Sequence, residues 1–193
     1  MNLTYGIGYN SGGKHPTEQG GKRAKSYQVW RDMLKRCYKA GIHTNSRNST
    51  YKDCTVCAEW LDFQNFAKWY EDNEYYGLGY ELDKDILSPE NNIYCPEFCR
   101  LVPQELNKLL INRGKMRGKY PQGVSKASSG VKYRSDIHIS GKTMYIGLFD
   151  TPEEAHQAYK EAKEQHVKNV ANKWRYHIAP EVYEALMSWE LKT

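Results

Sequence analysis

Long apolar runs are missing from this chain of 193 residues. A helix that crosses a bilayer needs roughly 20 consecutive apolar residues, and no segment approaches that length, so a transmembrane helix is excluded. Residues 1–5 also lack the positive region followed by an apolar stretch that marks a secretory signal. We therefore expect a cytoplasmic protein without a membrane partner.

Acidic side chains are absent from residues 108–126, which excludes a charge-balanced surface there. The same stretch contains six basic residues: Lys108, Arg113, Lys115, Arg117, Lys119 and Lys126. A glycine-spaced basic run between two domains is typical of a segment that follows nucleic-acid phosphates, because each nearby cation releases counterions. A solvated face with no partner is the alternative. The net charge of the whole chain is only +5, because residues 53–90 are predominantly acidic.

Two small domains fit the length of the chain. Residues 1–25 contain two glycine pairs and several cations, and they predict a flexible basic segment that orders only on nucleic acid. Residues 26–112 predict the first domain. Its first helix starts at Ser26 and carries an apolar stripe, and its second helix starts near Asp62, a good N-cap residue.

A strand–turn–strand–helix pattern closes the first domain. Residues 80–87 and 93–102 are typical of strands, and a helix opens at Pro103. This order is a ββα outline. If residues 80–87 are extended, the side chains of Asp83 and Asp85 project from the same face of the strand.

Residues 123–178 predict three strands followed by a helix. The expected strands are residues 123–126, 131–139 and 143–149, which are separated by turns containing Ser and Gly. Thr151 and Glu154 have the spacing of a capping box, and Pro152 suits the first helical position. The pattern therefore predicts a small sheet with one helix.

Alternation along the middle strand gathers basic side chains on one register. That register contains Lys132, Arg134 and His138, and the other contains Val131, Tyr133 and Ile137. The basic register would present a row of positive charge to a partner.

This C-terminal pattern resembles the AP2/ERF DNA-binding domain. The resemblance rests on residues 123–125, 133–134, 137–139 and 146–155, and on Ala158 followed by Tyr159. Domains of this family lay a three-stranded sheet in the major groove, so the resemblance implies a double-stranded DNA partner. The strand residues that it implies meet DNA are Lys126, Lys132, Arg134, His138 and Lys142.

The N-terminal domain resembles phage-type HNH homing endonucleases, many of which end in an AP2-like domain. The resemblance rests on residues 27–38, 56–63, 82–85 and 99–103, followed by Asn107. It implies an α+β protein in the cytoplasm of a bacterium or a phage-infected host. The implied parts are an HNH-like helical and ββα domain at 26–112, a basic linker at 113–122 and an AP2-like domain at 123–178. Within the linker, Arg113, Lys115 and Arg117 are the expected phosphate contacts.

DNA cleavage by an HNH enzyme needs a divalent metal ion held by a carboxylate, and a base that activates water. Asp83 matches the aspartate of the family motif, whereas Lys84 stands where the motif has histidine. In the cleaving interpretation Asp83 and Asp85 hold Mg²⁺, with Asn107 or Asn112 as a further ligand. Alternatively, Lys84 pairs with a phosphate and the protein is a catalytically inactive DNA binder. It would then act as a regulator, a DNA-coating protein or an inhibitor of a host DNA-directed activity.

Four of the five cysteines have a spacing compatible with a structural zinc ion. They are Cys54, Cys57, Cys95 and Cys99, and zinc-clamped ββα nucleases place such pairs on either side of the catalytic strands. In a chain expected to be intracellular, disulfides are disfavoured. The alternative is that these thiols are small buried hydrophobic side chains.

Residues 179–193 predict a short amphipathic helix. Its apolar side either packs back on the C-terminal sheet or contacts another chain. The second possibility covers a homodimer and a host-protein partner.

Overall fold

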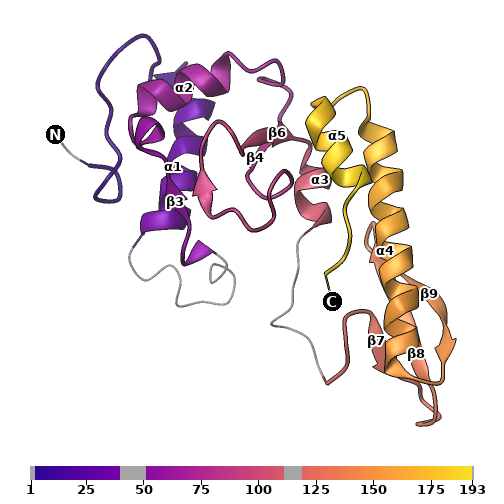
Figure 1. Cartoon of the computed structure of the whole chain (residues 1–193). Coiled ribbons are helices and arrows are strands. Elements are labelled where there is room, and N and C mark those ends of the chain that lie inside the picture. The colour runs from indigo at the N-terminus through magenta and orange to yellow at the C-terminus, as the bar shows by residue number, and fades with distance from the viewer. Residues whose placement is uncertain (1–2, 40–50, 111–118, 193) are drawn as a thin grey trace. The chain divides into compact units, whose positions relative to one another are not determined.

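The computed structural model describes residues 3–39, 51–110 and 119–192. The chain divides into two compact units, Met1–Lys108 and Leu109–Thr193. Both contain helices and small sheets (Figure 1), so the α+β class predicted from the sequence is confirmed. None of the helices within the described ranges has the length and apolar character of a membrane span.

The first unit is built around two amphipathic helices, α1 (Lys25–Tyr38) and α2 (Phe63–Glu71). The apolar stripe predicted for α1 is buried, and the fully buried rings of Trp30, Phe63 and Phe66 lie in one core. The indole Nε1 of Trp30 donates to the carbonyl oxygen of Trp60 at 2.7 Å, within the 3₁₀-helix Ala58–Leu61. Asp62 caps α2 as expected, because its carboxylate accepts from the backbone N–H of Gln64.

The amino-terminal segment is folded, contrary to the flexible arm that its composition predicts. Strands β1 (Glu18–Gln19) and β2 (Lys22–Arg23) form a hairpin, in which Gly20 and Gly21 adopt positive φ. His15 is buried, and its Nδ1 lies 2.7 Å from a carboxylate oxygen of Glu71. The glycine pair therefore makes a tight turn rather than a free chain.

The predicted ββα outline is wrong in its pairing. Strand β4 (Glu81–Asp83) pairs antiparallel with β6 (Arg100–Val102), whereas β5 (Ile93–Tyr94) pairs parallel with β3 (Thr55–Val56). The first predicted strand ends at Asp83 because the Asp83 carboxylate binds the next backbone N–H groups and turns the chain. Helix α3 (Gln104–Leu109) follows Pro103, as expected.

The second unit contains the three strands and the helix predicted for it. The antiparallel sheet has the order β7 (Val124–Lys126), β8 (Tyr133–Ile139), β9 (Lys142–Phe149), with an irregularity between Ser135 and Asp136. Helix α4 (Pro152–Trp174) packs on the sheet, and the predicted capping box of Thr151 and Glu154 is confirmed. The core beneath α4 contains Ile137 and Tyr159.

Helix α5 (Pro180–Met187) packs against α4. Its buried residues are Val182 and Leu186, and the following Leu191 joins the core of Ile137 and Tyr159. The apolar side of the C-terminal segment is therefore largely used within the second unit.

Candidate nucleic-acid interface and the Asp83 loop

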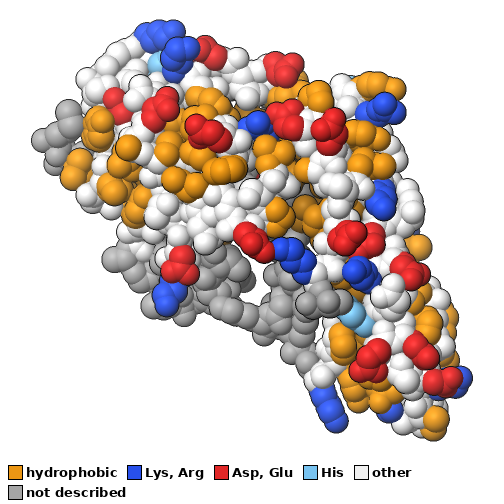
Figure 2. Space-filling view, in the orientation of Figure 1, with side chains coloured by type: hydrophobic (Ala, Val, Ile, Leu, Met, Phe, Trp, Pro, Cys, Tyr) orange, Lys and Arg blue, Asp and Glu red, His pale blue; other side chains and the backbone are white. Residues whose placement is uncertain are grey.

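Helix α4 covers one face of the three-stranded sheet and leaves the other exposed. Cross-strand pairing defines this open face, because directly paired residues share a side of the sheet. The open face consists of Ser125, Arg134, Asp136, His138, Thr143, Tyr145 and Leu148. Between its members on β8, Ser135 and Ile137 point the other way and are buried. Figure 2 shows the α4 side of this unit, where acidic and basic side chains are mixed.

Arg134 is the most highly organised cation on the open face. Its Nε and Nη2 atoms donate to the carboxylate of Asp136 at 2.7–2.9 Å. Its guanidinium carbon also lies 5.1 Å from the ring centroid of Tyr145. The bonds to Asp136 raise the pKa of Arg134 above its usual value. Asp136 was not among the predicted site residues, although a residue two positions along a strand shares the same face.

The two other cations of the predicted basic register have weaker partners. The Lys132 Nζ is 3.2 Å from a carboxylate oxygen of Asp150, and both side chains are largely exposed. Exposed pairs of this kind contribute about 0–1 kcal/mol, so a phosphate can replace Asp150. The Nδ1 of His138 lies 3.3 Å from the hydroxyl of Thr143.

Lys126 and Lys142 are not on the open face, contrary to the prediction that the five cations form one surface. Lys126 pairs with Tyr133, and Lys142 pairs with Ile139, so both belong to the opposite register. The Nζ of Lys126 stacks 3.9 Å from the Tyr133 ring centroid. Both lysines are exposed, at strand ends near the rim of the sheet. The linker cations Arg113, Lys115 and Arg117 lie outside the described residues.

The carboxylate of Asp83 is turned into the protein. Asp83 is only 7% exposed, and its Oδ1 accepts from the backbone N–H groups of Asp85 and Ile86 at 2.9 and 2.8 Å. Burial raises the pKa of Asp83 to about 6, although these two hydrogen bonds oppose the shift. The expected shared face of Asp83 and Asp85 is not formed, because the strand ends between them.

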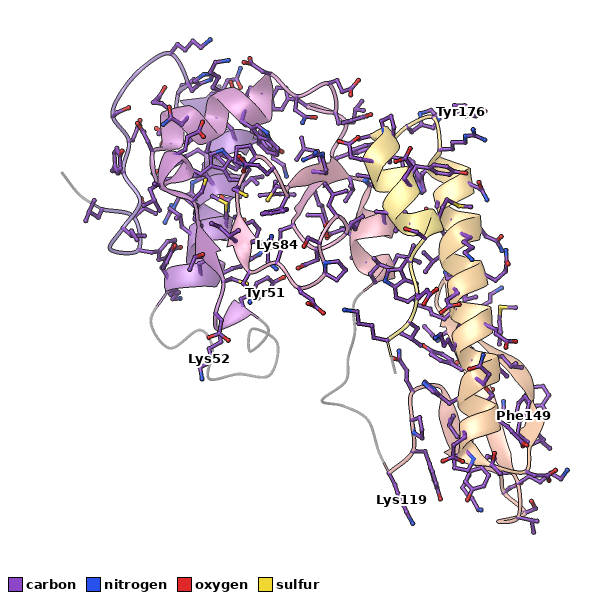
Figure 3. The ribbon with its side chains drawn as sticks, viewed as in Figure 1. Tyr51, Lys52, Lys84, Lys119, Phe149 and Tyr176 are labelled. Atoms are coloured by element: carbon purple, nitrogen blue, oxygen red, sulfur yellow. The ribbon has the colours of Figure 1, made fainter. Side chains whose placement is uncertain are left out.

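Lys84, the residue at the expected histidine position, is buried (Figure 3). Its Nζ donates to the carboxylate of Asp85 and to the carbonyl oxygen of Asn91, and it lies 5.8 Å from the Tyr94 ring centroid. Burial alone lowers the pKa of Lys84, but the hydrogen bond and charge of Asp85 outweigh it and the net direction is upward. Lys84 is therefore a protonated, ion-paired side chain and a poor general base.

Asn107 does not join the Asp83 loop through its side-chain amide. Its Nδ2 donates to one carboxylate oxygen of Glu81, and Gln104 donates to the other at 2.8 Å. These bonds tie α3 to β4. Asn112, the alternative ligand, lies outside the described residues.

The four spaced cysteines are positioned individually. Cys54, Cys95 and Cys99 are buried and Cys57 is half-buried, and burial raises the pKa of each thiol. Across residues 3–39, 51–110 and 119–192, no group of three or more His, Cys, Asp or Glu side chains is arranged to hold a metal ion. Their environment corresponds to the alternative in which the thiols are small buried side chains.

Comparison with known proteins finds no matching family model, no similar curated protein and no similar solved structure. A functional assignment therefore rests on the residues and contacts described above.

Proposed function

We propose that this protein binds double-stranded DNA through the open face of β7–β9. The observation that carries this proposal is the arrangement of Arg134, whose guanidinium is fixed by Asp136 and Tyr145 on the sheet face that α4 leaves uncovered. The resemblance to AP2/ERF domains, noted from the sequence, points to the same face.

The width of the sheet matches the major groove. Neighbouring strands lie roughly 4.8 Å apart, so a three-stranded sheet measures about 10 Å across its strands. The major groove of B-DNA is about 12 Å wide and admits a β-ribbon. The minor groove, at about 6 Å, is too narrow for the three strands.

The side chains of the open face suit contacts with base edges and phosphates. An arginine held flat can donate two parallel hydrogen bonds to O6 and N7 of guanine. The hydroxyl of Thr143 and the ring of His138 add donors and acceptors beside it. Lys132, Lys126 and Lys142 near the rim are placed to approach phosphates, and we include the linker cations in the same role.

Within this proposal, the geometry of the Asp83 loop supports binding without strand cleavage. The two candidate Mg²⁺ ligands are used separately, since Asp83 accepts from its own loop backbone and Asp85 pairs with Lys84. In the described part of the chain, neither these carboxylates nor the four cysteines are gathered as metal ligands. We therefore favour the class of regulators, DNA-coating proteins and inhibitors over a homing endonuclease.

A salt titration of binding tests the assignment to the open face. Fluorescence anisotropy of a labelled duplex would be measured from roughly 50 to 300 mM salt, because affinity that depends on phosphate contacts falls steeply over this range. The double variant Lys132→Ala/Arg134→Ala should weaken binding and lower the slope of log K against log[salt] by about 1.8, since each phosphate contact contributes about 0.9. Lys22→Ala removes an exposed lysine from the first unit and serves as the matched control. An unchanged slope in the double variant would remove these residues from the interface.

The cleavage alternative has its own test. Plasmid DNA is incubated with the wild-type chain and Mg²⁺ or Mn²⁺, and nicking is followed on a gel. We expect intact plasmid at every metal concentration. Metal-dependent nicking that disappears in Asp83→Asn would instead establish the nuclease.

A further inference from the structure

The connection between α4 and α5 exposes an aromatic side chain that packing does not explain. Tyr176 is 86% exposed, more than any other large apolar side chain in the described part of the chain. It lies at the turn between the two helices (Figure 3). A single exposed tyrosine is ordinary on a protein surface, so the surroundings of this one decide whether it has a role.

A guanidinium lies between the exposed tyrosine and a second tyrosine. The Arg175 guanidinium carbon is 5.6 Å from the Tyr176 ring centroid and 5.3 Å from the Tyr183 ring centroid. Tyr183 is anchored in turn, because its hydroxyl donates to the side-chain oxygen of Asn172 at 2.9 Å. Arg175 is therefore oriented before any ligand arrives.

A second cation–aromatic pair lies one residue earlier. The Nζ of Lys173 is 5.4 Å from the Trp174 ring centroid. The Trp174 ring also contacts the ring of His177 edge-on, with 6.2 Å between centroids. We call residues 173–177 together with Tyr183 the turn cluster.

The charge around the turn cluster has one sign. No acidic residue occurs between Glu164 and Glu181, whereas Lys168, Lys173 and Arg175 fall in that interval. Cations near the last turn of a helix interact favourably with its carbonyl end. That effect accounts for Lys173 and Arg175 but not for the exposed ring of Tyr176 beside them.

We propose that the turn cluster binds single-stranded nucleic acid, with a base stacked on Tyr176 and phosphates near Arg175 and Lys173. Exposed aromatic rings alternating with cations are the combination that single-strand binding uses, because every base has a π-face and every phosphate a negative charge. In a duplex the faces of the bases are covered by their neighbours, so Tyr176 selects unpaired nucleotides. This inference goes beyond the duplex contact of the open face, because it assigns a different surface and a different form of nucleic acid.

Matched tyrosine variants separate the two surfaces. Binding of the full chain to a labelled oligothymidine and to a labelled duplex, each about 20 nucleotides long to exceed the site size of one module, is measured by anisotropy for wild type, Tyr176→Ala and Tyr145→Ala. Loss of one base stack should weaken oligothymidine binding about tenfold in Tyr176→Ala, with duplex binding unchanged. Tyr145→Ala, on the open face, should weaken duplex binding and leave oligothymidine binding unchanged. Both rings are more than half exposed, so neither variant should lose its fold, as circular dichroism would verify.

A charge-conserving variant tests the role of Arg175. Arg175→Lys keeps the cation but loses the planar group between the two rings, so affinity for oligothymidine should fall several-fold at an unchanged salt slope. Equal oligothymidine affinity in wild type and Tyr176→Ala would overturn the inference, and so would wild-type protein that binds the duplex but not the oligothymidine. Failure of the duplex proposal is distinct, because it appears as duplex binding that Tyr145→Ala and the Lys132/Arg134 double variant do not change.

Discussion

Replacing Asp83 by asparagine should make the protein more stable at neutral pH, although Asp83 occupies the motif position expected of a catalytic carboxylate. The side chain is 7% exposed, and burial raises its pKa from 3.8 to about 6 in the folded protein. A charged carboxylate at this position is therefore disfavoured by the fold. Asparagine keeps an oxygen that accepts from the N–H groups of Asp85 and Ile86, but it carries no charge.

The pH window follows from the two pKa values. Between pH 3.8 and about 6 the folded chain binds the Asp83 proton more tightly than the unfolded chain does. The stabilising effect of this proton is complete below pH 3.8 and is lost as the pH rises through about 6. One pKa unit corresponds to about 1.4 kcal/mol, so the loss amounts to about 3 kcal/mol at most. The stability difference between Asp83→Asn and wild type should therefore vanish near about pH 4 and reach its maximum above about pH 6.5.

Urea unfolding followed by tryptophan fluorescence measures this difference. Trp30 and Trp60 are fully buried in the first unit and report on the core beside β4. Asp83→Ala is the matched control, because it removes the charge and also both hydrogen bonds, which should cost about 1–3 kcal/mol for each buried N–H left without a partner. The prediction is refuted if the stabilities of wild type and Asp83→Asn differ by the same amount at about pH 4 and about pH 7.5, or if the asparagine variant is the less stable at the higher pH.

Two further predictions concern packing. A Cβ at Gly123 would lie 2.0 Å from the ring of Tyr159, and the residue has φ +80°, so Gly123→Ala should lower the melting temperature far more than Gly130→Ala, which has positive φ but open space around it; equal shifts would show that the ring moves aside freely. In native protein a thiol reagent should label half-buried Cys57 before fully buried Cys99, whose pKa burial raises, and rapid labelling of Cys99 would contradict the packing described for it.

The second unit was predictable from the sequence because its signals are local. The strands are separated by turns that contain glycine, and the capping box of Thr151 and Glu154 identifies the start of α4 within one residue. Each of these signals acts over a few residues. The same is true of α1 and of Asp62 as the cap of α2, which the sequence also predicted correctly.

The first unit was harder because its sheets join distant segments. The pairing of β3 with β5 brings residues 55–56 beside 93–94, and no short-range pattern specifies that contact. The turn at Asp83 was missed for a different reason. An aspartate in an apparently alternating segment also accepts hydrogen bonds from the residues that follow it, and in this chain that local bond ends the strand.

The candidate interface shows the same division between local pattern and context. Alternation placed Arg134 and His138 on the open face correctly, but it did not show that Asp136 neutralises part of the charge there. It also assigned Lys126 and Lys142 to that face, whereas the pairing of β7, β8 and β9 places them on the other register. Charge counting alone therefore overstates the positive character of this surface.

The pair of Arg134 and Asp136 affects recognition more than affinity. A surface ion pair contributes only about 0–1 kcal/mol, and the nearby carboxylate reduces the attraction of the sheet for phosphates in general. At the same time, the bonds to Asp136 and the contact with Tyr145 hold the guanidinium in one orientation. An arginine that is already oriented loses less side-chain entropy when it meets a base edge. The open face is thus better suited to discriminating between base pairs than to binding any polyanion, which is the property expected of a sequence-reading surface.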